Sequence, residues 1–104
     1  SQVMKYDAVQ ECAAIAVPSE YGEDEVMVVL AAKPGQTVDP VALLKFLQPR
    51  MAHFMIPRYI RIMDELPKTP TTKIQKGPLR EAGITADTWD REEAGIKIRA
   101  ERLL

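Results

Sequence analysis

Lys73 stands in a segment whose neighbours would hold its ammonium group in a fixed position. Prolines stiffen the backbone on the approach, threonine hydroxyls flank the cation, and Ile74 supplies an apolar anchor directly after it. An ammonium presented in this way can stabilise negative charge that grows on a phosphate or carboxylate in a transition state. The alternative is that Lys73, Lys76 and Arg80 form a solvated cationic face without chemistry.

Other catalytic arrangements are missing from the sequence. His53 is the only histidine and Cys12 the only cysteine, so we expect no His/Cys zinc site, no Ser-His-Asp triad within this chain and no Cys-His pair. We assign no metal ligands. The stretch from Lys68 to Lys73 has the composition of a phosphate-binding loop but lacks the glycines and the strand-to-helix context. The residues therefore do not support a self-contained nucleotidase.

The composition is that of an ordinary globular chain, and it narrows the classes of function. The 104 residues include 14 lysines and arginines against 15 aspartates and glutamates, and 46% of the residues are apolar. A nucleic-acid-binding domain would carry a marked basic excess, so we expect no nucleic-acid partner. No apolar stretch approaches the roughly 20 residues that span a bilayer, and a single cysteine favours a reducing compartment. We therefore expect a cytoplasmic protein without a membrane span.

Three segments predict the strands that position these residues. Residues 11–17 form an unbroken apolar run, which predicts a central strand covered on both faces. Residues 25–33 follow a polar loop and are expected to pair antiparallel with the first strand. In residues 59–63 isoleucines alternate with other side chains, and this alternation predicts a third strand. We expect a small, mainly antiparallel three-stranded sheet.

Helices are predicted between and after these strands. Asp39-Pro40 is typical of a helix N-terminus, and Pro49 should end or kink that helix near Leu47. We expect a helix with this break that runs to about His53. A short helix is expected over residues 78–82 with Gly83 as its C-terminal cap, and a further helical turn around residues 88–93.

These elements predict one α+β domain in the order α-β-β-α-β-α, with helices packed on the sheet. The domain covers residues 1–104, with a core over about residues 9–83 and a C-terminal helical turn and tail over residues 84–104. Periodicity does not decide whether residues 96–99 form a short edge strand or part of the tail.

Three segments in the same order carry the motifs of a known family: VQECAAIAVPSEYGEDEV (residues 9–26), AHFMIPRY (residues 52–59) and DELPKTPTTKIQK (residues 64–76), the last followed by Leu79-Arg80. They resemble the C-terminal domain of the acyl-adenylate-forming enzymes, which include acyl-CoA synthetases, firefly luciferases and the adenylation domains of peptide synthetases. The likeness covers most of the chain. In that family this domain is a mobile lid on a larger N-terminal domain that binds ATP and the carboxylic acid.

The resemblance implies a function and the residues that serve it. The chain would be the lid of an ATP-dependent acyl-CoA synthetase, which converts a carboxylic acid, ATP and coenzyme A (CoA) to acyl-CoA, AMP and pyrophosphate. Lys73 matches the lysine that stabilises charge during adenylation, together with a Mg²⁺ held elsewhere. Phe54 and Arg58 match positions that touch CoA, the first by packing on adenine and the second by binding a phosphate.

The resemblance also implies partners and limits. The partner would be the N-terminal adenylating domain of the same enzyme, which is absent from this sequence, and the substrates would be small molecules. We expect no bound cofactor and no activity in the isolated domain.

Two departures from the family pattern concern the loop around Lys73. Thr72 stands where the family commonly has glycine, so we expect that no glycine-only backbone conformation is required there. Gly77-Pro78 is expected to interrupt what is often a continuous helix. Neither change removes the cation.

Several alternatives stay open at this point. Phe54 can equally be a core aromatic residue, and Arg58 can simply cover a surface. The whole chain can instead belong to an adenylation domain that loads a carrier protein, or be a stand-alone α+β binding module without chemistry. A ligase predicts several hundred residues upstream, whereas a binding module predicts a short gene with its own initiator methionine.

Overall fold

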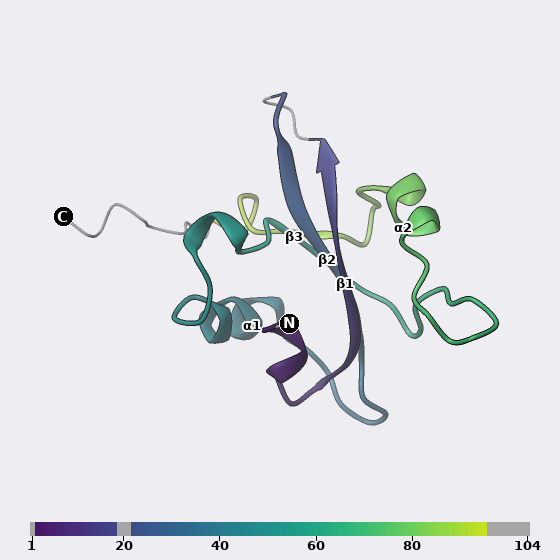
Figure 1. Cartoon of the computed structure of the whole chain (residues 1–104). Coiled ribbons are helices and arrows are strands. Elements are labelled where there is room, and N and C mark those ends of the chain that lie inside the picture. Colours follow the sequence, from purple (N-terminus) through teal and green to yellow (C-terminus); the bar gives the residue numbers. More distant parts are fainter. Residues whose placement is uncertain (1, 19–21, 96–104) are drawn as a thin grey trace.

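The described residues form a four-stranded sheet in the order β1-β2-β3-β4 (Figure 1). The structure is a computed structural model that describes residues 2–18 and 22–95. In chain order the elements are the 3₁₀ helix η1 (Val3–Lys5), β1 (Val9–Pro18), β2 (Asp24–Ala32), α1 (Pro40–Leu47), the 3₁₀ helix η2 (His53–Met55), β3 (Tyr59–Ile62), α2 (Lys76–Ala82) and β4 (Trp89–Asp90). The predicted α+β class is confirmed, but the sheet has one strand more than predicted.

Strand β1 lies at the edge of the sheet, and the prediction of a central strand is wrong. It pairs antiparallel with β2, as predicted. Ala13, Ile15 and Val17 are buried, whereas Ala14 and Ala16 between them are exposed. The apolar run is unbroken because small alanines occupy the exposed face, where a single apolar residue costs little.

An irregularity in register between Val9 and Glu11 shifts the start of β1. Val9 joins the apolar cluster on the α1 face, whereas Ala13 and Ile15 belong to the cluster on the opposite face. Glu11 shares that opposite face with Ala13 because alternate residues of a strand point the same way. The irregularity therefore turns the Glu11 carboxylate toward the segment between β3 and α2.

Helix α1 connects β2 to β3 and allows these two strands to run parallel. Its N-terminus is as predicted, because Asp39 accepts a hydrogen bond from Val41 N–H and Pro40 takes the first position. The helix ends at Leu47, and Pro49 follows two residues later. It does not run on to His53 as expected, because η2 is a separate 3₁₀ turn. The predicted antiparallel pairing is found for β1–β2, and the β2–β3 pair makes the sheet mixed. The additional strand β4 pairs antiparallel with β3.

The helical turn predicted around residues 88–93 is wrong at its centre, where Trp89–Asp90 forms strand β4. Asp90 pairs with Tyr59 and Trp89 with Ile60. Pairing with a strand about 30 residues earlier leaves no local periodicity, so the sequence pattern could not reveal it. Residues 96–99, for which the sequence does not decide between an edge strand and a tail, lie outside the described residues.

Helix α2 begins at Lys76, so Gly77-Pro78 does not interrupt it and that prediction is wrong. Both residues lie in the first turn, where backbone N–H groups have no intrahelical partner to lose. Gly83 caps the C-terminus as predicted, with a positive φ of 59°. In the part of the chain that the structure describes, no helix is long and apolar enough to cross a bilayer.

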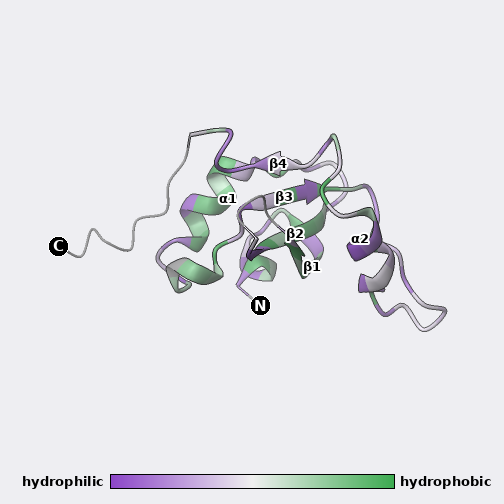
Figure 2. Ribbon diagram, turned by 90° about the horizontal axis from the view of Figure 1, so that it is seen from above, coloured by the Kyte–Doolittle hydropathy of each residue, from purple (hydrophilic) through white to green (hydrophobic). Residues whose placement is uncertain are grey.

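Two apolar clusters fill the two faces of the sheet. The cluster on one face contains Leu44 and Leu47 of α1, and the cluster on the other contains Leu66 and Leu79. Accordingly, α1 and α2 lie on opposite sides of the strands in both views (Figure 1 and Figure 2). Between β3 and α2 the chain leaves the sheet and projects outward, and this segment carries the predicted cation.

Candidate active-site loop

The segment between β3 and α2 folds as a narrow hairpin, which we call the Lys73 hairpin (residues 67–75). Lys68 and Ile74 pair across it as an antiparallel bridge. Two backbone hydrogen bonds of 2.8 Å flank the bridge: Thr69 N–H to Lys73 O, and Gln75 N–H to Pro67 O. The bridge and these bonds fix the stem of the hairpin and with it the backbone position of Lys73.

Thr69 organises the tip of the hairpin. Its carbonyl oxygen accepts a hydrogen bond from Thr72 N–H at 2.8 Å, and its hydroxyl oxygen accepts one from Lys73 N–H at 3.1 Å. Pro70 takes the second position of this turn, where its fixed φ is favourable. Proline and threonine therefore stiffen the segment in the way that the sequence predicts.

Thr72 adopts the left-handed backbone conformation, with φ of +64°. This conformation favours glycine, but it is not restricted to glycine, because a threonine adopts it here. A residue in the left-handed region directly after a tight turn is a common way to close a short hairpin, and glycine usually takes that place. Here a β-branched residue adopts it, at a cost of about 1–2 kcal/mol.

The Lys73 side chain is exposed. It belongs to the segment between β3 and α2 that projects from the sheet (Figure 1). Among the residues that the structure describes, no acceptor lies within hydrogen-bonding or ion-pairing distance of its ammonium. Lys76 and Arg80 are exposed as well, but they lie on α2. Lys73 differs from them because a hydrogen-bonded turn holds it beyond the sheet, where its charge can reach an anion on another surface.

Lys68, the other lysine of the hairpin, is held by three acceptors. Its Nζ lies 2.9 Å from Glu11 Oε2, 3.2 Å from Leu66 O and 3.4 Å from Glu65 Oε2. The hydrogen bond to Glu11 is the main reason why the pKa of Lys68 lies above its ordinary value. Because an ammonium has three donors, these contacts leave Lys68 none for an external anion.

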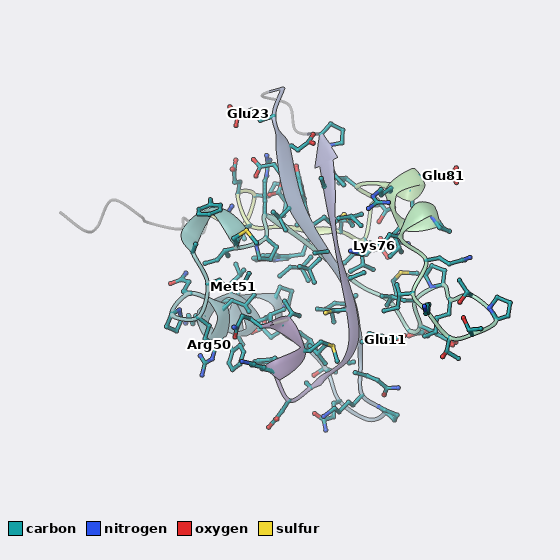
Figure 3. The ribbon with its side chains drawn as sticks, viewed as in Figure 1. Glu11, Glu23, Arg50, Met51, Lys76 and Glu81 are labelled. Atoms are coloured by element: carbon teal, nitrogen blue, oxygen red, sulfur yellow. The ribbon has the colours of Figure 1, made fainter. Side chains whose placement is uncertain are left out.

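Glu11 is the residue of this site that sequence reasoning missed. Burial alone would raise the pKa of its carboxyl, but hydrogen bonds from Leu66 N–H at 3.1 Å and from Lys68 lower the pKa overall. Figure 3 labels Glu11 on β1, beside the base of the projecting segment. Its signal in the sequence is a carboxylate on the face of β1 where Ala13 and Ile15 are apolar.

Arg58 lies inside a cluster of carboxylates and is only 4% exposed. Its Nε and Nη2 donate to the two carboxylate oxygens of Asp90 at 3.1 and 3.2 Å. Glu25 and Glu92 lie 3.6 and 3.7 Å from the guanidinium. A phosphate would have to displace one of these groups, so this placement favours a structural role that joins β3 to β4. The contact of Arg58 with CoA stays a prediction.

Phe54 is 71% exposed in η2, so the alternative of a core aromatic residue is wrong. Ile56, just beyond η2, belongs to the apolar cluster on the α1 face, whereas Leu66 and Ile74 pack on the other face. The segment that carries Phe54 therefore joins the α1 face of the sheet, whereas the Lys73 hairpin packs on the other face. The contact of Phe54 with CoA also stays a prediction.

Comparison with known proteins identifies the family. The family model of the AMP-binding enzyme C-terminal domain matches residues 1–73. The chain belongs to this family. The matched segment ends at Lys73 and includes Glu11, Phe54 and Arg58, so it confirms the resemblance on which the site prediction rests.

The relatives are ligases. The chain is 37% identical over 83 residues to the probable CoA ligase CCL11 of Humulus lupulus, which covers 78% of this chain and 15% of that protein. It is 38% identical over 81 residues to the vibriobactin-specific 2,3-dihydroxybenzoate-AMP ligase of Vibrio cholerae. That alignment covers 77% of this chain and 15% of the ligase. The crystal structure of ATP-bound MatB from Rhodopseudomonas palustris matches with a TM-score of 0.73 at 30% identity, over 78% of this chain and 16% of that chain.

The chain spans about 15% of the length of the curated relatives that it matches. The domain of this family is thus one part of a larger AMP-binding enzyme in those relatives. The family uses ATP, as the ATP-bound neighbour illustrates.

Proposed function

We propose that this domain is the lid of an ATP-dependent acyl-CoA synthetase and that Lys73 serves its adenylation step. The partner is the N-terminal adenylating domain of the same enzyme, which binds ATP, the carboxylic acid and Mg²⁺. The observation that carries the proposal is the exposed ammonium of Lys73 at the tip of a hairpin rooted on the sheet, in a domain of this family. The cytoplasmic location of the enzyme stays a prediction.

The first half-reaction explains why a cation is needed. The substrate carboxylate attacks the α-phosphorus of ATP, the bond to the pyrophosphate oxygen breaks, and acyl-adenylate and pyrophosphate form. Two anions approach each other, and negative charge develops on the phosphoryl oxygens. An ammonium held beside these oxygens lowers the barrier by roughly 3–4 kcal/mol if it acts like other pre-oriented donors. Lys73 stabilises charge in this step and transfers no proton.

The second half-reaction uses another part of the domain. The thiolate of CoA attacks the acyl carbon, and AMP leaves with its phosphate oxygen. A rotation of the lid would bring a different face over the adenylate. The exposed ring of Phe54 offers a flat apolar surface for the adenine of CoA, and the segment that carries it joins the α1 face of the sheet through Ile56, opposite the Lys73 hairpin. This separation supports two orientations, one for each step.

The acceptor of the acyl group distinguishes the proposal from its nearest alternative. A domain that loads a carrier protein would carry out the same adenylation, and the relatives include ligases named for CoA and for AMP. The complete enzyme should therefore be given acyl-adenylate with either free CoA or a phosphopantetheinyl carrier protein. Faster transfer to CoA supports the proposal, whereas transfer to the carrier alone supports the alternative.

Replacement of Lys73 tests the adenylation role. In the complete enzyme we expect Lys73→Ala to slow acid-dependent ATP–pyrophosphate exchange about 100- to 1,000-fold, the loss typical of a pre-oriented charge donor. Lys76→Ala is the matched control, because it removes another exposed lysine three residues away, and it should change the rate less than about threefold. Equal effects of the two substitutions would show that the cations form only a solvated face.

A further inference from the structure

We propose that Glu11 is a positioning residue for adenylation, which holds the Lys73 hairpin against the sheet so that the Lys73 ammonium keeps its outward position. The proposal rests on the function proposed for Lys73 and adds a residue from a distant strand to it. Glu11 would not touch the reactants and would act only through the hairpin.

One carboxylate oxygen joins strand β1 to the hairpin. Glu11 Oε2 accepts a hydrogen bond from Leu66 N–H at 3.1 Å and another from Lys68 Nζ at 2.9 Å. These residues are 55 and 57 positions away in the sequence. The side chains of Glu11 and Lys68 are only 16% and 22% exposed, so solvent screens this pair less than an ordinary surface pair.

The position of Lys68 is passed on to Lys73 through the stem of the hairpin. Lys68 pairs with Ile74, the residue directly after Lys73, and Thr69 N–H donates to Lys73 O at 2.8 Å. Leu66 and Ile74 hold the apolar side of the stem, because both pack in the cluster beneath it. Glu11 supplies the polar side of the same attachment.

The residue type at position 11 points to a role beyond stability. Ala13, Ile15 and Val17 fill this face of β1 with apolar side chains, and a partly buried carboxylate there costs free energy unless it is paired. An apolar pair in place of a buried ion pair is often as stable or more stable. Unlike an apolar side chain, the carboxylate accepts directional hydrogen bonds, and these fix the positions of a backbone N–H and an ammonium.

The charges of the pair persist across the neutral range. The pKa of Glu11 lies below its ordinary value and that of Lys68 above it, so both groups stay ionised when the enzyme works. Glu65 also contacts Lys68, but its side chain is 79% exposed and its oxygen lies 3.4 Å away. Glu65 is therefore the matched control, with the same charge and the same partner but without the hydrogen bond to Leu66 N–H.

The test combines amide hydrogen exchange and kinetics in the complete enzyme. In Glu11→Ala we expect exchange across residues 66–75 to rise about tenfold while the rest of the domain is unchanged. The kcat of ATP–pyrophosphate exchange should fall about tenfold, with the KM for ATP within about twofold, because a displacement near 1 Å can cost up to about 100-fold. Glu65→Gln should leave both readouts near those of the wild type.

A double substitution separates positioning from stability. Glu11→Leu with Lys68→Met replaces the ion pair by apolar groups, so the unfolding midpoint should stay close to that of the wild type while kcat falls about tenfold. If Glu11→Ala does not fold, Glu11→Gln replaces it, because glutamine keeps an acceptor for Leu66 N–H and should lose about threefold in kcat. Unchanged exchange across residues 66–75 in these variants, or an unchanged kcat beside a strongly impaired Lys73→Ala, overturns the proposal. If Lys73→Ala itself adenylates normally, the function proposed for Lys73 fails, and the exchange data alone then decide whether Glu11 holds the hairpin.

Discussion

Thr72 shows how a residue can work against the conformation that its position demands. Its φ of +64° places it in the left-handed region, where a branched Cβ is unfavourable. Hydrogen bonds around Thr69 hold the turn despite this cost, since Thr72 N–H and Lys73 N–H both donate to that residue. The residue next to the proposed cation is thus strained, and the turn is rigid because its neighbours determine its shape.

Glycine at position 72 should therefore stabilise the fold. Thr72→Gly removes about 1–2 kcal/mol of left-handed strain and adds about 0.5–1 kcal/mol of backbone entropy in the unfolded chain. The difference lies between about 0 and 1.5 kcal/mol, so we expect a net gain near the middle of that range, about 0.7 kcal/mol. Thr71→Gly is the control, because its neighbour Thr72 is the residue with positive φ, and it should lose about 0.5–1 kcal/mol. Urea unfolding of the three proteins measures both changes. A loss of stability in Thr72→Gly equal to that in Thr71→Gly would show that position 72 carries no strain.

At the scale of elements, the attachment of β4 to the sheet depends on Arg58, because the strand is too short to be held by its backbone pairing alone. The strand has two residues, and Arg58 joins it to β3 through both oxygens of Asp90. Burial by itself would raise the pKa of Asp90, but the hydrogen bonds from Arg58 and from the Glu92 backbone lower it below its ordinary value. The contribution of Asp90 to stability is therefore complete when the pH is above the ordinary pKa of an aspartate in the unfolded chain. This contribution is lost as the pH falls through the lower pKa of Asp90 in the folded state.

Acid should release β4, and Trp89 can report it because it is the chain's single tryptophan. We expect the fluorescence of Trp89 to change below about pH 4 in the wild-type domain. In Asp90→Asn the fluorescence should already differ at pH 7, with a loss of stability of about 2 kcal/mol and a smaller change in acid. Asp64→Asn, at an exposed position, should behave like the wild type. Identical acid transitions in the wild type and Asp90→Asn would contradict the assigned role of the pair.

The sequence predicts elements well where the signals are local. Asp39, Pro40 and Pro49 are enough to place both ends of α1, and Gly83 is enough to place the end of α2. Burial on two faces is a tertiary property, so the apolar run of β1 could not reveal that its alanines face solvent. Strand β4 has no local signal for the same reason, because its pairing depends on the distant β3.

In the candidate site too, the sequence predicts residues with local signals and misses those whose partners are distant. Lys73 could be found from its neighbours and from the family motif, since the turn that presents it is local. Glu11 stands out in the sequence only as a carboxylate beside apolar residues, and its role could not be found there, because its partners Leu66 and Lys68 are more than 50 residues away. Arg58 and Phe54 were placed by resemblance, and only the structure shows that one is buried and the other exposed.

At the scale of the whole molecule, the two faces of one sheet bear the features proposed for two reactions. The Lys73 hairpin projects from the face that Leu66 and Leu79 cover, and Phe54 stands two residues before Ile56, which packs in the α1 cluster. A lid that presents these faces in turn needs to carry only one cation into the partner domain for adenylation. Loss of that cation should therefore impair one step and spare the other.

The rates of the two half-reactions in Lys73→Ala test this claim most directly. In the complete enzyme, adenylate formation from acid and ATP should slow about 100- to 1,000-fold. Conversion of supplied acyl-adenylate and CoA to acyl-CoA should stay within about threefold of the wild-type rate, because Lys73 is not used in that step. Equal losses in both half-reactions, measured by single-turnover quench, would contradict the assignment of Lys73 to adenylation.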